Sequence, residues 1–190
     1  CRVRAHPRVA PLVMPADYSW VSNSISESAA QGIDDAWVAR VGFLLFGVGV
    51  VLTTMASAAR WRWPGAALNG LFGVLMMCAA VFSTRPWNTD LPFDEVQSSL
   101  QSLVASTMGF AYCFGVLAVL IGDRRMPWSQ RGFSVVAILS AIVLPLGMAA
   151  LPSVAGILQR LMFLIAYVWF GMEAIRSTRS VAPEVSPERA

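Results

Sequence analysis

The residues of this sequence that could form a chemical site centre on an arginine within a hydrophobic run. Arg160 follows Gln159 close to the start of the apolar stretch that begins at Val154. A guanidinium in apolar surroundings is costly unless it is paired, so a partner is expected. Glu27 and Asp90 are the acids that we predict to pair with it, because a carboxylate can accept both hydrogen bonds of a guanidinium fork.

Asn23 and Ser26 lie in the same N-terminal segment as Glu27 and complete the candidate ligand-binding set. One interpretation is an outward-facing polar pocket that recognises a lipid headgroup or a small anionic or polar ligand. The other is a structural tether, in which Arg160 holds the N-terminal segment and the 84–98 loop to the rest of the protein. Only the pocket predicts a ligand bound among these side chains.

Other kinds of chemistry have few residues to support them. His6 is the only histidine, and Cys1, Cys78 and Cys113 show no metal-binding spacing. A histidine-ligated haem, a histidine zinc site and a Ser-His-Asp triad are therefore not expected, and neither a metal nor a cofactor is predicted. An acid/base pair or a divalent-cation site formed by Glu27 and Asp90 is the alternative use of these two acids.

The elements that position these residues follow from composition. Of the 190 residues, 56% are hydrophobic and only 13% are charged, against about 25% charged in soluble domains. Most of the exterior must therefore face something other than water. Spanning a bilayer takes about 20 mostly apolar residues in a helix, and five stretches qualify: 36–59, 65–82, 100–121, 133–151 and 154–175. The predicted fold is an all-α transmembrane bundle with five spans, covering 36–176, between an N-terminal segment, 1–35, and a disordered tail, 177–190.

The distribution of arginines predicts the orientation of this bundle. Two arginines lie in the turn at 60–64, three at 123–131 and three beyond residue 175, whereas the 84–98 loop has one arginine and three acids. Cytoplasmic loops are enriched in basic residues. We therefore expect a cell-membrane protein with a cytoplasmic C-terminus. The N-terminal segment, the 84–98 loop and Arg160 then share the outer surface.

Three segments carry a resemblance to a known family. They are YSWVSNSISESAAQG (Tyr18–Gly32), the Thr89-Asp90 pair and GILQRLMFLIAYVWFGMEAIR (Gly156–Arg176). This pattern resembles a family of bacterial and archaeal membrane proteins called domain of unknown function 998. The resemblance implies six spans, with one helix before the Tyr-Ser segment, and it implies no particular activity. Many members carry a histidine where this chain reads SSLQSLVAS (Ser98–Ser106).

The start of the chain bears on the number of spans. It begins with Cys1 rather than Met. We expect a first helix to precede this sequence, which would give six spans in the complete protein, as the resemblance also implies. A lipoprotein-type cysteine exposed by signal removal is the alternative.

These observations favour a non-enzymatic, lipid- or partner-binding accessory protein. Its expected partners are membrane lipids and other membrane subunits. A small-solute or ion transporter and an intramembrane lipid-modifying enzyme are the alternatives. Transport has less support, since no predicted span carries a charge at its middle and no inverted repeat is visible. Nucleic acid is not an expected partner, because the net charge of +3 comes from arginines near helix ends.

Overall fold

The computed structural model describes residues 14, 17–88 and 90–181, with side chains up to 178. The predictions that concern Cys1, His6 and the tail beyond 181 lie outside these residues. The described part of the chain is helical and contains no strand, which confirms the all-α prediction. Its elements, in order, are η1 (Glu27–Ala29), α1 (Ala36–Val81), α2 (Glu95–Gly122), α3 (Trp128–Ala150), η2 (Pro152–Val154) and α4 (Ala155–Val181).

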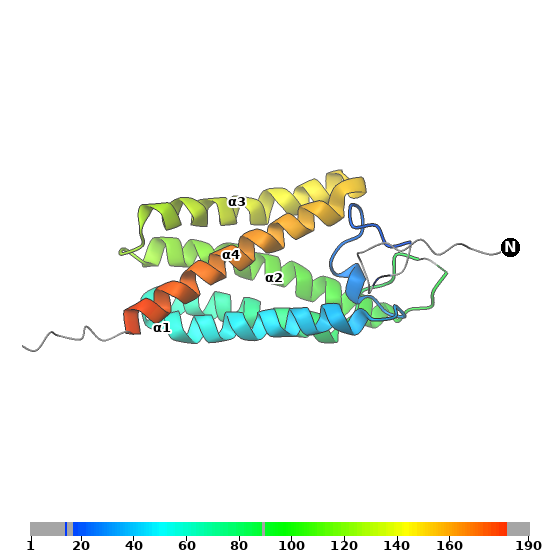
Figure 1. Ribbon diagram of the computed structural model, residues 1–190, viewed down its shortest axis with the longest axis horizontal. Coiled ribbons are helices and arrows are strands. Elements are labelled where there is room, and N and C mark those ends of the chain that lie inside the picture. The colour runs from blue at the N-terminus through cyan, green and yellow to red at the C-terminus, as the bar shows by residue number, and fades with distance from the viewer. Residues whose placement is uncertain (1–13, 15–16, 89, 182–190) are drawn as a thin grey trace, which may run out of the picture.

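The long helix α1 folds back on itself at Arg62. This residue has φ 59° and ψ 168°, outside the helical region, and Pro64 follows two residues later. Proline disfavours helical geometry in the residue before it and donates no backbone hydrogen bond. A Cβ added to Gly47 would lie 2.7 Å from the carbonyl oxygen of Gly73, although a straight helix would separate these residues by about 39 Å. Residues 36–61 and 63–81 are therefore two antiparallel arms (Figure 1).

Among the residues that the structure describes, four helices are long and apolar enough to cross a membrane. The predicted number of five spans is not confirmed in that form, because the runs predicted at 36–59 and 65–82 belong to the single element α1. Helix α2 begins earlier than predicted, since the Asp94 side chain accepts hydrogen bonds from the backbone of Val96 and Gln97 and caps it. Helix α4 continues to Val181, beyond the predicted end of the bundle at 176.

The core of the bundle is aromatic and tightly packed. Trp61, Val116 and Trp169 are fully buried, and the rings of Phe72 and Phe170 stack with their centroids 5.4 Å apart. Large apolar side chains also cover the outside of all four helices, among them Leu45, Met55, Phe110, Leu146 and Leu164. An apolar exterior of this extent indicates a protein that is embedded in a membrane.

The two ends of the bundle differ. Residues 17–35 and 83–94 join at one end, where the Gln31 backbone N–H donates to Thr84 and its side chain to the carbonyls of Ser83 and Asp94. We call these residues the cap. The α1 bend, the α2–α3 turn and the end of α4 lie at the opposite end, which we call the bend end (Figure 1). The sequence predicts that the N-terminal segment, the 84–98 loop and the start of α4 lie at the same end of the bundle, and the structure has them there.

Candidate functional site

Arg160 is the centre of the contacts between the cap and α4. Its Nη1 donates to the carbonyl oxygens of Trp20 at 2.8 Å and Asn23 at 3.0 Å, and to that of Gly156, one turn earlier, at 2.9 Å. Its Nη2 donates to the Tyr18 hydroxyl at 2.8 Å. The guanidinium also lies 4.5 Å from the centroid of the Trp20 ring, in cation–π geometry. The charge is thus accommodated by neutral groups of the cap.

The predicted pairing of Arg160 with Glu27 or Asp90 is wrong. The Glu27 carboxylate instead accepts from the Ser24 backbone N–H, and the Ser24 hydroxyl accepts from the Glu27 N–H at 3.2 Å. This reciprocal arrangement has the bonding pattern of a capping box, and it closes the turn from Ser24 to Glu27 that leads into η1. Asp90 is exposed, and its backbone N–H bonds to the Asn88 side chain. A turn-rich cap exposes carbonyl oxygens that helices do not use, and these supply the acceptors that the guanidinium needs.

The other predicted ligand residues hold the cap together. Gln159 accepts a hydrogen bond from the Ile25 backbone N–H through its side-chain oxygen. The Asn23 side chain accepts from the Ser19 N–H at 2.8 Å, and the Ser26 carbonyl accepts from the Ala29 N–H. The structure therefore brings Arg160 and Gln159 together with the segment that contains Asn23, Ser26 and Glu27, but it leaves Asp90 in the neighbouring loop.

Two further residues of this contact were not singled out from the sequence. The Tyr18 hydroxyl donates to the Ser24 carbonyl oxygen at 2.9 Å while it accepts from Arg160. Burial raises the pKa of Tyr18, and the nearby Arg160 charge opposes that change only in part. The phenol therefore stays protonated and can serve both partners. At Gly156, an added Cβ would lie 2.8 Å from the Trp20 carbonyl oxygen, so only glycine lets the cap approach α4 this closely.

A shallow hollow of about 140 Å³ opens beside this contact rather than at Arg160. None of the six predicted ligand residues lines it. The Trp87 indole N–H donates to the Asp17 carboxylate at 3.1 Å. Asp34 provides a second carboxylate, and the remaining lining residues are Gly32, Ile33, Asn88 and Leu91.

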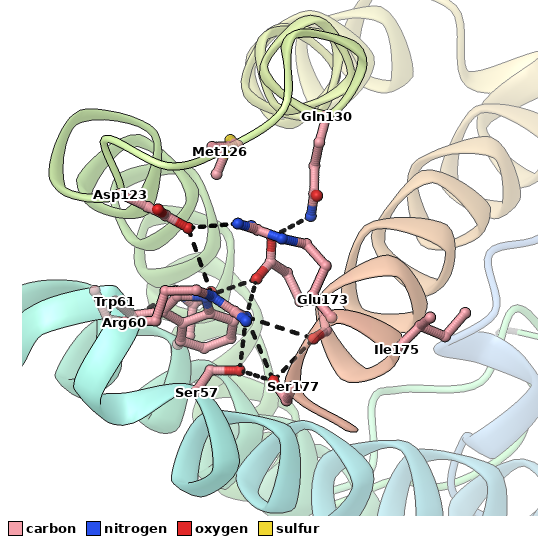
Figure 2. A network of polar contacts seen from close by, with 12 residues as sticks. Ser57, Arg60, Trp61, Asp123, Met126, Gln130, Glu173, Ile175 and Ser177 are labelled. Atoms are coloured by element: carbon pink, nitrogen blue, oxygen red, sulfur yellow. Dashed lines mark hydrogen bonds and ion pairs between the residues drawn. The ribbon is translucent and has the colours of Figure 1, made fainter. Parts of the chain in front are cut away.

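A second polar centre closes the bend end, around the fully buried Glu173 (Figure 2). Its carboxylate accepts from Arg60 Nη2 at 2.6 Å, from the Trp61 indole N–H at 2.8 Å and from Arg176 Nη1 at 3.3 Å. The Gln130 side-chain amide is the fourth donor. Two carboxylate oxygens offer about four acceptor positions, so Glu173 is saturated. A carboxylate in this state has no free position with which to take a proton from a substrate.

Asp123 completes this centre and balances its charge. Its carboxylate lies 3.0 Å from Arg176 Nη2 and 3.5 Å from Arg60 Nε. Two arginines and two acids together carry no net charge, which is how a buried ionic group can be tolerated. Arg60 belongs to α1, Asp123 directly follows α2, and Glu173 and Arg176 belong to α4. Gln130 adds a contact from α3. We call this set, with Trp61 and Gln130, the bend-end network.

Sequence reasoning found only one part of the bend-end network. The i,i+3 spacing of Glu173 and Arg176 in the sequence predicts a pair on one helix face, and the structure contains that pair. The participation of Arg60, Asp123 and Gln130 was missed, because they lie in two separate segments, 60–64 and 123–131, whose sequences are typical of turns at the membrane interface. The sequence did hold one signal for this network: Glu173 is the only acid within the last apolar run. Burial of its carboxylate there requires more than one cation or hydrogen-bond donor.

The geometry defines an all-helical membrane protein with an apolar flank, a polar cap and an ionic network at the opposite end. In the part of the chain that the structure describes, no group of three or more potential ligands could hold a metal ion. The chain belongs to the DUF998 family, described as a protein of unknown function, whose model matches residues 9–176. No curated protein and no solved structure matches it.

Proposed function

We propose that this chain is a five-crossing membrane protein that acts by binding, and that its cap receives a lipid headgroup at the outer surface. The crossing number rests on the two arms of α1. Residues 36–61 and 63–81 would measure about 39 Å and about 28 Å as straight helices, close to or above the roughly 30 Å of hydrocarbon in a bilayer. Each arm is long enough for one crossing.

The orientation in this proposal rests on charge. Arg60, Arg62, Arg124, Arg125, Arg131 and Arg176 gather at the bend end, whereas the described cap and its surroundings hold Arg40, Arg85 and Arg160. Basic residues favour the cytoplasmic side. The bend end and the C-terminus are then cytoplasmic, and the cap lies outside the cell membrane.

The hollow in the cap is the observation that carries the binding function. Asp17 and Asp34 give it negative charge, and Trp87 adds an aromatic face. These groups suit the amine of a zwitterionic headgroup, which carboxylates and aromatic rings both attract. Arg160 and Gln159 fix the cap to α4, so the hollow is held in shape before a ligand arrives. In this proposal Asn23, Ser26 and Glu27 shape the cap, and Asp90 belongs to the loop beside the hollow.

The two alternatives have less support from the described residues. The argument against a transporter rests on charge, since sites for ions and charged solutes lie near the bilayer midplane. The buried acids of the described residues, Asp123 and Glu173, lie at the bend end instead. An enzyme built on Glu27 and Asp90 would need free carboxylates. Glu27 is engaged in its own turn, and Asp90 is exposed on a separate loop.

Native mass spectrometry of the protein released from phosphatidylethanolamine-containing nanodiscs tests the binding function. We expect Asp34→Asn to retain several-fold less of this lipid than the wild type. Asp35→Asn is the matched control, because Asp35 is exposed, adopts a left-handed conformation that asparagine tolerates, and does not line the hollow. Equal retention by the wild type and both variants would show that the cap hollow is not a headgroup site.

The crossing number and orientation have their own test. In a background without the three natural cysteines, a single cysteine replaces either Asp90 in the cap loop or Arg124 at the bend end. A membrane-impermeant maleimide added to intact cells should label D90C but not R124C. Labelling of both, or of R124C alone, would contradict the proposed arrangement.

A further inference from the structure

The bend of α1 forms a second hollow, at the opposite end from the cap. It has a volume of about 240 Å³ and lies between the bend and the last turn of α2. Trp63, Ile121 and Ala118 give it apolar walls, and Arg62 brings a cation to it. Trp61, Pro64 and Gly122 complete the lining. We propose that this hollow binds the phosphate and glycerol end of an anionic phospholipid, a function beyond that proposed for the cap.

Arg62 is the residue that best supports a ligand here. Its φ of 59° and ψ of 168° fall in a region that side-chain-bearing residues rarely adopt, because it is sterically strained for them. Glycine would adopt this conformation without strain. Within the described part of the chain, the Arg62 guanidinium forms no hydrogen bond or ion pair. An arginine held in this conformation and without a protein partner is available for an anion.

Four of the other arginines at the bend end separate into two groups, and Arg131 donates to the backbone carbonyl oxygens of Met126 and Asp123. Arg60 and Arg176 are neutralised by Glu173 and Asp123 in the bend-end network. Arg124 and Arg125 are exposed and follow Gly122 directly after Asp123. Adjacent Cα atoms are about 3.8 Å apart, so these two arginines begin close to the hollow. Arg62 therefore brings an uncompensated positive charge to the hollow, and the exposed Arg124 and Arg125 add positive charge in the turn that follows its lining residue Gly122.

The surroundings identify the source of the anion as a lipid rather than dissolved phosphate. Trp63 is 81% exposed and Ile121 is 72% exposed, which suits side chains that contact hydrocarbon and the interface. Tryptophan and arginine together are typical of the headgroup level of a bilayer. The volume is below the roughly 300 Å³ of a small-molecule pocket. The hollow can thus hold one end of a lipid while the acyl chains extend along α2 and the second arm.

Tryptophan fluorescence provides a direct test, because Trp63 lines the hollow. The protein is reconstituted in phosphatidylcholine with a small fraction of brominated phosphatidylglycerol or, in parallel, brominated phosphatidylcholine. Bromine quenches tryptophans that it contacts. We expect stronger quenching by the anionic lipid, and we expect Trp63→Phe to remove that excess. Equal quenching by both lipids in the wild type would overturn the proposal.

Two arginine substitutions make the test specific. Arg62→Gln should lower the relative association constant of phosphatidylglycerol about fivefold, the effect of one cation near an anionic headgroup. Arg85→Gln removes the same charge at the cap end and should leave the constant unchanged. Equal losses in both variants, or no loss in Arg62→Gln, would contradict a site at the bend.

Arg62→Gly separates binding from folding. Glycine relieves the strained backbone, so the thermal midpoint should stay equal or rise, whereas the preference for phosphatidylglycerol should fall as in Arg62→Gln. A glycine variant that keeps the full lipid preference would overturn the role of Arg62. Because the cap proposal is tested with Asp34→Asn and a zwitterionic lipid, either site can fail without the other.

Discussion

At the scale of single residues, Arg160 and Glu173 show two solutions to the same problem of placing a charge in an apolar bundle. Arg160 donates to three carbonyl oxygens and one phenol, so no opposite charge is needed. Glu173 is fully buried and takes two arginines and two neutral donors. The exposed side of Arg160 explains the difference, since an interfacial guanidinium loses less hydration than a carboxylate in the core.

The geometry around Arg160 predicts that lysine cannot replace it. An ammonium has the same charge, but its single nitrogen cannot reach Trp20, Asn23 and Tyr18 together. Loss of one or more charge-assisted hydrogen bonds, each about 1.5–3 kcal/mol, should speed amide hydrogen exchange in residues 18–30 at least tenfold. Arg85→Lys, at an exposed position, is the control. Unchanged exchange in Arg160→Lys would show that charge alone holds the cap.

Removal of the hydroxyl group should change the thermal stability of the protein differently at Tyr18 and at Tyr112. The Tyr112 hydroxyl is buried and has no hydrogen-bond partner among the described residues, whereas the Tyr18 hydroxyl bonds to Arg160 and to Ser24. A buried hydroxyl without a partner costs about 1–3 kcal/mol. Tyr112→Phe should therefore keep or raise the thermal midpoint in detergent, and Tyr18→Phe should lower it. A lower midpoint for Tyr112→Phe would indicate an unrecognised partner.

At the scale of elements, the sequence predicts helices well and their limits less well. The apolar runs from 36 to 175 coincide with α1 to α4, because hydrocarbon permits little else. Pro64 and its neighbours indicated a turn, and the chain does reverse at Arg62. The early start of α2 depends on the Asp94 cap, a local hydrogen bond that hydropathy does not report.

The reversal of α1 depends on close contact between its arms, which a single methyl group should disturb. A Cβ on Gly47 would meet the Gly73 carbonyl oxygen at 2.7 Å and the Met77 backbone nitrogen at 3.0 Å. Neither atom can move without shifting a helix, so Gly47→Ala should destabilise the protein by about 1–3 kcal/mol.

Gly49→Ala, two residues away on the same arm, is the matched control for that substitution. A Cβ at Gly49 would meet nothing within 4 Å, and alanine favours helix. Its thermal midpoint should equal or exceed that of the wild type. Equal midpoints for both alanine variants would mean that the arms do not pack as described.

At the scale of the whole molecule, long-range polar contacts were harder to predict than the fold. Hydropathy and arginine counts placed the cap segments together and the bend at the opposite end. They could not show that carbonyl oxygens, rather than Glu27 or Asp90, satisfy Arg160, because backbone acceptors have no signature in the sequence. They also could not join Arg60 to Asp123 and Glu173, which are far apart along the chain and become neighbours only after the helices pack.

The bend-end network joins α1, α3, α4 and the residue that follows α2, so its charge balance should govern the stability of the whole bundle. Glu173→Gln preserves shape but leaves two arginines facing Asp123 alone, and breaking a buried ion pair on one side costs about 3–5 kcal/mol. The thermal midpoint should fall sharply, whereas Glu95→Gln, at an exposed position of α2, should not change it.

The decisive comparison adds Arg60→Gln to Glu173→Gln. The double variant again holds one cation, Arg176, and one acid, Asp123, which lie 3.0 Å apart. If neutrality is what the core requires, the second substitution should recover part of the stability lost in the first, with a coupling of about 0.5–3 kcal/mol in a double-mutant cycle. Losses that simply add would instead mean that each hydrogen bond to Glu173 acts alone and that the network is not a charge-balanced unit.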